Sequence, residues 1–161
     1  MLNVKIVCVG KIKDSWITEG IAEYEKRLKA YCKFNIVELK EYKLPMSPSQ
    51  SDIDKCILSE GEDIIRELEK DTKTSVIAMC IEGKQLSSPE LANKLLEYSF
   101  TSPNITFVIG GSYGLSDTVK SRANFKLSVS KMTFPHQVFR LILSEQIYRA
   151  FSIINNSKYH K

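Results

Sequence analysis

The sequence predicts an α/β protein with a mainly parallel sheet and helices on both of its faces. Short apolar runs rich in β-branched residues alternate along the 161 residues with segments whose apolar residues recur at helical spacing. Such alternation is typical of a parallel sheet that helices cover on both sides. No low-complexity tract divides the chain, so we expect one domain over residues 1–161.

The first half of the chain carries two apolar runs, and each is followed by a helical pattern. Pro45 and Pro48, together with several serines, predict a loop over residues 40–51. The expected elements are a buried strand over Leu2–Val9, a helix from Asp14 or Ser15 to Leu28, a strand over Phe34–Leu39 and a polar helix over Asp52–Glu69.

The second half continues the alternation. The segment Glu82-Gly83-Lys84 predicts a turn out of the third strand, and Pro89 favours a helix start just before it. The expected elements are a strand over Ser75–Ile81, a helix from Ser87 to about Phe100, a strand over Ile105–Ile109, a short strand over Phe125–Val129 and a long helix over Pro135–Ile154.

Composition excludes several classes of protein. No run of 18 apolar residues exists, so no membrane span is predicted. The first residues read as a strand and show no export signal, from which we expect a cytoplasmic protein. The four cysteines form no CxxC motif and no cluster with histidine, so neither a zinc site nor any other metal site is predicted, nor a disulfide framework.

Positive charge gathers near the end of the chain. Residues 120–161 hold eight Lys or Arg and one acid, a net charge of +7, which leaves −3 for residues 1–119. This asymmetry favours an anionic partner, nucleic acid first, although scattered surface lysines explain it equally well.

Three strand ends are distinctive, at residues 79–83, 109–112 and 129–134, and the last two carry unusual loops. Gly110-Gly111 follows one strand and can bring backbone close to a ligand, although taken alone it is more often a tight turn. The segment Ser130–Phe134 follows another and holds apolar side chains in a loop, which suits either a pocket wall or a buried connection. Ligands of parallel sheets bind beyond the carboxyl ends of the strands, so both loops are candidate site segments.

The apolar residues of the final helix indicate that a second subunit covers part of it. Its apolar residues cover more than one face, and in a short chain a second copy is the simplest cover, so we expect a homodimer. Glu145 and Arg149 are spaced to pair along it. The only histidines, His136 and His160, suit proton transfer, although each alone is more often a surface residue.

Taken together, these motifs resemble one family. They are Ile109–Leu115, Leu127–His136, Glu145–Ala150 and the terminal Tyr159-His160, and the match extends to Val9-Gly10-Lys11 near the start. In order and spacing they are similar to the RlmH-type (YbeA-like) methyltransferases of the SPOUT class. The resemblance implies a C-terminal trefoil knot, and transfer of a methyl group from S-adenosyl-L-methionine to N3 of the pseudouridine at position 1915 of 23S rRNA, by a homodimer acting on the assembled ribosome.

The resemblance also implies site residues. The cofactor pocket would be formed by Met79, Gly110, Val129, Ser130, Lys131, Met132, Thr133 and Phe134. His136, Tyr159 and His160 would lie near the acceptor base, with one of the histidines taking its proton, while Arg140 and Lys161 would contact rRNA phosphate. Two rival functions stay open: a non-catalytic ribosome-binding or RNA-binding protein, and a SPOUT methyltransferase that acts on tRNA.

Overall fold

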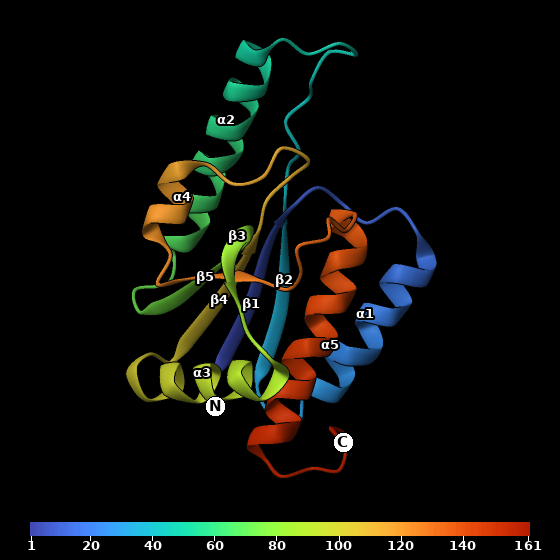
Figure 1. Ribbon diagram of the computed structural model, residues 1–161, viewed down its shortest axis with the longest axis vertical. Helices are drawn as coiled ribbons and strands as arrows, with labels where there is room; N and C mark the ends of the chain where they lie inside the picture. Colours follow the sequence, from blue (N-terminus) through green and yellow to red (C-terminus); the bar gives the residue numbers. More distant parts are fainter.

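The computed structural model describes all 161 residues, which form strands and helices in strict alternation (Figure 1). Every strand and helix expected from the sequence is present, and the structure also defines the bounds of one short helix, α4. The elements are β1 Asn3–Val9, α1 Ser15–Leu28, β2 Lys33–Leu39, α2 Gln50–Leu68, β3 Thr74–Gln85, α3 Ser88–Thr101, β4 Asn104–Ile109, α4 Asp117–Arg122, β5 Phe125–Ser128 and α5 His136–Ile154.

The five strands form one sheet in the order β2-β1-β4-β3-β5, and every pairing is parallel. Helices α1, α3 and α5 cover one face, and α2 and α4 cover the other. This arrangement confirms the predicted parallel sheet between two helical layers.

Residue alternation along the central strands explains why they are apolar at most positions. In β1, Val4, Ile6 and Cys8 pack into the core beneath α1, α3 and α5. The intervening Val7 and Val9 belong to the second core, beneath α2 and α4. A strand buried on both faces needs apolar residues on both, and β1 carries polar residues only toward its amino end, at Asn3 and Lys5.

Serine caps set the beginnings of two helices. Ser49 accepts the N–H of Asp52, and the Asp52 side chain accepts the N–H of Ser49, so α2 begins at Gln50, slightly before the expected Asp52. Ser87 and Glu90 form the same reciprocal pair at the start of α3. These capping boxes satisfy backbone N–H groups that would otherwise lack partners.

The predicted turn at Glu82-Gly83-Lys84 is wrong, because β3 continues through it to Gln85. The strand shifts register here: Leu127 of β5 pairs first with Met79 and then with Lys84. A Cβ on Gly83 would lie 2.7 Å from the backbone carbon of Leu127. The missing side chain therefore allows β3 to bend closely around β5.

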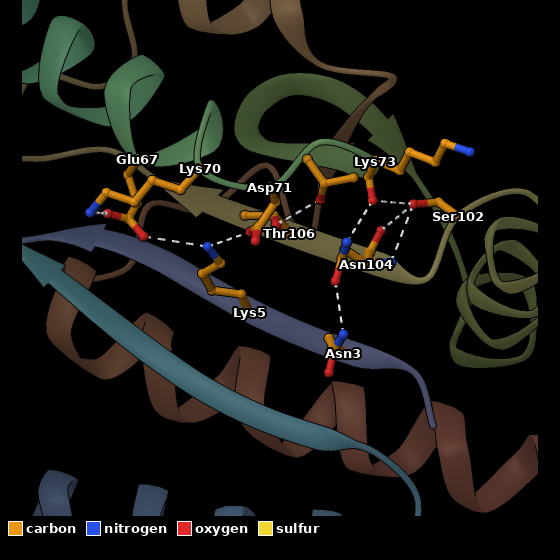
Figure 2. A network of polar contacts seen from close by, with 10 residues as sticks. Asn3, Lys5, Glu67, Lys70, Asp71, Lys73, Ser102, Asn104 and Thr106 are labelled. Atoms are coloured by element: carbon orange, nitrogen blue, oxygen red, sulfur yellow. Dashed lines mark hydrogen bonds and ion pairs between the residues drawn. The ribbon is translucent and has the colours of Figure 1, made fainter.

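Polar side chains close the amino end of the sheet (Figure 2). Lys5 Nζ lies 2.5 Å from Asp71 Oδ2 and 3.4 Å from Glu67 Oε1. The Asn3 amide donates to Asn104 Oδ1 at 2.9 Å, which joins β1 to β4 beside their first residues. The network fixes the end of α2 to the strands, at the edge opposite the two candidate loops.

Helix α5 lies between α1 and α3 and has no fully exposed residue. A Cβ on Gly20 of α1 would lie 2.9 Å from Leu141, so the two helices approach closely there. The chain itself thus supplies part of the cover expected from a partner, although Val138, Leu141 and Ile142 stay only half-buried. None of the helices has the length and apolarity that crossing a membrane requires.

Candidate functional site

A cavity of about 600 Å³ opens at the carboxyl ends of β4 and β5, beside the part of β3 that extends beyond its pairing with β4. Its main walls are residues 79–82 of β3, the glycine turn (residues 110–114) and the connecting loop (residues 129–135) between β5 and α5, and residues of α4, β5 and α5 also contribute to the lining. The two loops that the sequence singled out therefore face each other across one cavity.

Backbone packing shapes the glycine turn. The N–H of Gly114 donates to the carbonyl of Gly111 at 3.1 Å, and Gly114 has a φ of +85°, a conformation that favours glycine. A Cβ on Gly110 would lie 2.7 Å from the backbone carbon of Gly114. Because the turn folds back on itself this tightly, only backbone can occupy the wall at Gly110.

Two serine hydroxyls hold the connecting loop. Ser128 Oγ donates to the carbonyl of Ser130 at 3.0 Å, and the N–H of Met132 donates to Ser130 Oγ at 3.0 Å. The Phe134 ring stacks on Phe139 of α5 with centroids 6.2 Å apart. Met132 remains 74% exposed, so this apolar side chain lies at the open rim of the cavity.

An ion pair lies on the cavity wall. Lys120 Nζ of α4 is 2.5 Å from Glu82 Oε1 of β3, and both residues line the cavity. The hydrogen bond from Lys120 lowers the pKa of Glu82, and the same bond raises the pKa of Lys120. Each partner therefore favours the charged form of the other, and the cavity wall carries a charged pair.

The structure brings most of the predicted cofactor residues together. The cavity lining includes Met79, Gly110, Val129, Ser130, Met132, Thr133 and Phe134, and it also includes His136 at the start of α5. Lys131 is exposed and does not contribute to the lining.

Arg140 does not fit the phosphate contact expected of it. Its side chain is 0% exposed. Nη1 donates to Glu38 Oε2 at 2.8 Å, and Nη2 donates to the carbonyls of Val9 and Gly10 at 2.7 and 2.8 Å. The guanidinium is thus used inside the protein, where it joins α5 to the ends of β1 and β2, and the predicted RNA contact is wrong for this residue.

The tail residues Tyr159 and His160 lie outside the cavity lining. Tyr159 donates to Glu145 Oε1 at 3.0 Å, and His160 Nδ1 is 3.3 Å from Arg149 Nη1. Arg149 also pairs with Glu145, as its spacing predicted. These contacts fix the tail on the C-terminal half of α5, and Figure 1 shows the chain end at the opposite end of α5 from the connecting loop. Lys161 is exposed beside them.

Sequence reasoning missed two groups near the cavity. Lys120 and Glu82 lie far apart in sequence and are paired only by the bend of β3 around β5. Glu60 of α2 is buried behind the glycine turn, and nothing in its helical pattern distinguishes it from a surface acid. The structure contains no cluster of three or more His, Cys, Asp or Glu side chains able to hold a metal ion.

Comparison with known proteins identifies the family. The sequence model of the family described as "Predicted SPOUT methyltransferase" matches residues 2–160. The chain is 51% identical to the ribosomal RNA large subunit methyltransferase H of Limosilactobacillus reuteri, over 99% of this chain and 100% of that protein. It is 49% identical to the protein of the same name from Bacillus pumilus, with the same coverage of both chains.

A solved structure supports the fold. A probable methylase family protein from Haemophilus influenzae Rd KW20 superposes with a TM-score of 0.56 at 18% identity, covering 98% of this chain and 70% of the other. At that identity the likeness concerns the fold alone. The matches over nearly the whole sequence are more specific, and by them this chain belongs to the SPOUT methyltransferases and, within them, to the RlmH family.

Proposed function

We propose that the protein transfers a methyl group from S-adenosyl-L-methionine to N3 of a pseudouridine, at position 1915 of 23S rRNA, in the assembled ribosome and hence in the cytoplasm. Membership of a family whose relatives are named ribosomal RNA large subunit methyltransferase H supports rRNA as the substrate. The observation that carries the proposal is the single cavity that the glycine turn and the connecting loop share.

The cavity suits this methyl donor in size and character. Its volume of about 600 Å³ lies within the usual range for sites of small ligands. Leu115, Leu127 and Phe134 offer apolar walls for an adenine ring, and the glycine turn and the connecting loop present backbone close to the space. A sulfonium donor supplies an electrophilic methyl group without help from a metal ion, so the protein has to position the reactants and remove a proton.

His136 is the histidine of this chain that lines the cavity, and we assign it a place beside the acceptor base. When N3 takes the methyl group, its proton must leave, and a neutral imidazole can accept that proton near neutral pH. His160 is the alternative acceptor, but only if it belongs to a second chain.

A homodimer would bring the tail to the cavity. From His136 to Arg149 the helix rises about 20 Å, so Tyr159 and His160, fixed near Arg149, lie far from their own cavity. The half-buried apolar residues Val138, Leu141 and Ile142 of α5 offer a surface for a second copy. In such a dimer the tail of one chain would complete the site of the other, with Lys161 contacting rRNA phosphate.

The contacts between β3 and β5 support the C-terminal trefoil knot. Leu127 pairs with Met79 on one part of β3 and with Lys84 on a later part, so β3 bends around β5. After β5 the chain passes from the face covered by α4 to the face covered by α5. We propose that residues after 127 thread through the loop formed by the end of β3, which would fix the cavity walls together.

The direct test is methyl transfer to ribosomes that lack the modification. Purified protein is incubated with these ribosomes, free 23S rRNA or tRNA, and S-adenosylmethionine labelled in its methyl group, and the labelled nucleotide is mapped. We expect label at one pseudouridine of 23S rRNA, and only in assembled ribosomes. Label in tRNA would make the protein a tRNA methyltransferase, and salt-sensitive ribosome binding without any label would make it a non-catalytic binding protein.

A further inference from the structure

The backbone conformation of Gly111 does not require a glycine, but the space around it does. Its φ is not positive, so the conformation is open to any residue. A Cβ at this position would nevertheless lie 2.6 Å from Glu60 Oε1, and its three nearest neighbours would all be atoms of the Glu60 carboxylate. The carboxylate of α2 therefore fills the space where a side chain of the glycine turn would stand.

Glu60 is one of the few charged residues that are buried in this protein. It is 5% exposed, and its second oxygen, Oε2, accepts the N–H of Tyr42 at 3.1 Å. Tyr42 lies in the loop of residues 40–49, which Figure 1 shows extending from the end of β2 to the start of α2. One carboxylate thus contacts the glycine turn on one side and this loop on the other.

The next residue of α2 strengthens the same contact. Gly61 has no room for a Cβ because the side chain of Ser116 occupies that position. Ser116 follows the glycine turn and caps α4 by accepting the N–H of Val119 at 3.3 Å. Consecutive residues of α2 therefore support the turn at Gly111 and the segment that leaves it.

We propose that Glu60 is a positioning residue for the methyl donor: its carboxylate holds the glycine turn in the shape that receives the donor and joins the turn to the 40–49 loop. This inference rests on the proposed function of the cavity. Glu60 itself does not line the cavity, so it acts through the turn and takes no part in the chemistry.

Burying the Glu60 carboxylate is energetically unfavourable, which supports a specific role for this residue. Burial raises the pKa of Glu60, and the N–H of Tyr42 opposes that shift by stabilising the charged form. A buried carboxylate is destabilising unless its oxygens are satisfied. Glutamine at this position would keep an acceptor for Tyr42 and nearly the same shape, whereas alanine would remove both contacts.

The test is titration calorimetry of the full chain with S-adenosylmethionine. Glu60→Ala should weaken binding at least about tenfold, and Glu60→Gln should stay within about threefold of wild type. In the ribosome assay the KM for the donor should rise in Glu60→Ala while kcat at saturating donor changes less than about twofold. Glu67→Ala is the matched control, since Glu67 lies on the same helix and is 7% exposed, but pairs with Lys5 and Lys70 far from the cavity.

A double variant tests the contact itself. Gly111→Ala should weaken donor binding because its methyl group meets the carboxylate, and Gly111→Ala combined with Glu60→Ala should bind no worse than Glu60→Ala alone. The inference would be overturned if the losses of donor affinity in the two single variants multiplied in the double variant. Equal losses of affinity in Glu60→Ala and Glu67→Ala would also overturn it. Failure of the wild-type protein to bind the donor at all would instead overturn the proposed function.

Discussion

Tyr159 donates a hydrogen bond to Glu145 across 3.0 Å, and this bond fixes the end of the chain on the helix that precedes it. The Tyr159 ring also packs edge-on against Tyr148 with centroids 4.8 Å apart, and the Arg149 guanidinium lies 4.8 Å from its centre. The tail therefore has a defined place at the far end of α5 from His136.

The proposed homodimer predicts that mixed dimers recover activity that each parent lacks. One chain carries Thr133→Trp, which fills the cavity, and the other carries Tyr159→Phe with His160→Ala. We expect each variant alone to be inactive on ribosomes, and co-expressed chains to regain roughly a quarter of wild-type turnover, because half of the randomly formed dimers hold one complete site. No recovery in confirmed mixed dimers would place each tail at its own cavity or outside the reaction, and full activity of the tail variant alone would remove the tail from the chemistry.

Replacing Arg140 should destabilise the fold. Arg140→Ala leaves two buried backbone carbonyls and the partly exposed Glu38 without their donor, so we expect the free energy of unfolding to fall by about 2 to 4 kcal/mol. Arg140→Lys should lose less, since a lysine keeps the charge but cannot bridge all three acceptors. Urea unfolding measures both, and Arg122→Ala, at an exposed position, is the control that should cost under about 0.5 kcal/mol. Equal stability of Arg140→Ala and the control would contradict the assigned role.

Gly83→Ala should disturb the cavity from outside it. The added methyl group would meet the backbone of Leu127 at 2.7 Å, so either β3 or β5 must shift. We expect a loss of about 1 to 3 kcal/mol in unfolding free energy, together with weaker donor binding, because Leu127, Ser128 and the connecting loop move with β5. If Gly83→Ala unfolds more easily but binds the donor with wild-type affinity, the bend of β3 does not determine the shape of the cavity.

Stability should fall above pH 9, partly through Cys32. Burial raises the pKa of this thiol from its ordinary value of 9.0 to about 12 in the folded protein. Between these values the unfolded chain loses the proton and the folded chain keeps it, so the unfolded state gains by at most about 1.4 kcal/mol per pH unit. Below pH 9 this contribution is constant. Unfolding of Cys32→Ala from pH 7 to 11 should show a shallower loss than wild type, and parallel curves would contradict the effect.

The fold could be predicted best where burial produces a regular spacing of apolar residues along the sequence. The central strands, buried on both faces, appear as mainly apolar runs, and the start of α3 shows in Ser87 and Pro89. The start of α2 was placed too late, because the loop was expected to reach residue 51 and the cap is Ser49. The bend of β3 at Gly83 was mistaken for a turn, because glycine between charged residues is typical of turns and the close approach of Leu127 depends on strands far apart in sequence.

The site was predictable only as segments. The glycine turn and the connecting loop could be found because they follow strands whose carboxyl ends share one edge of the sheet. The burial of Arg140 could not, since a basic residue near the start of a helix usually faces solvent, and its partners Val9, Gly10 and Glu38 come from the other end of the chain. Glu60 was hidden for the same reason, because its role depends on a contact between helix α2 and a loop that follows β4.

The central claim is that the methyl donor binds between the glycine turn and the connecting loop. A crystal structure of the protein with S-adenosylmethionine or its demethylated product S-adenosylhomocysteine tests it most directly. We predict that the ligand lies in the cavity beside Gly110, Ser130 and Phe134, with its sulfur facing the side on which His136 lies. A ligand bound elsewhere, with this cavity empty at saturating concentration, would contradict the account.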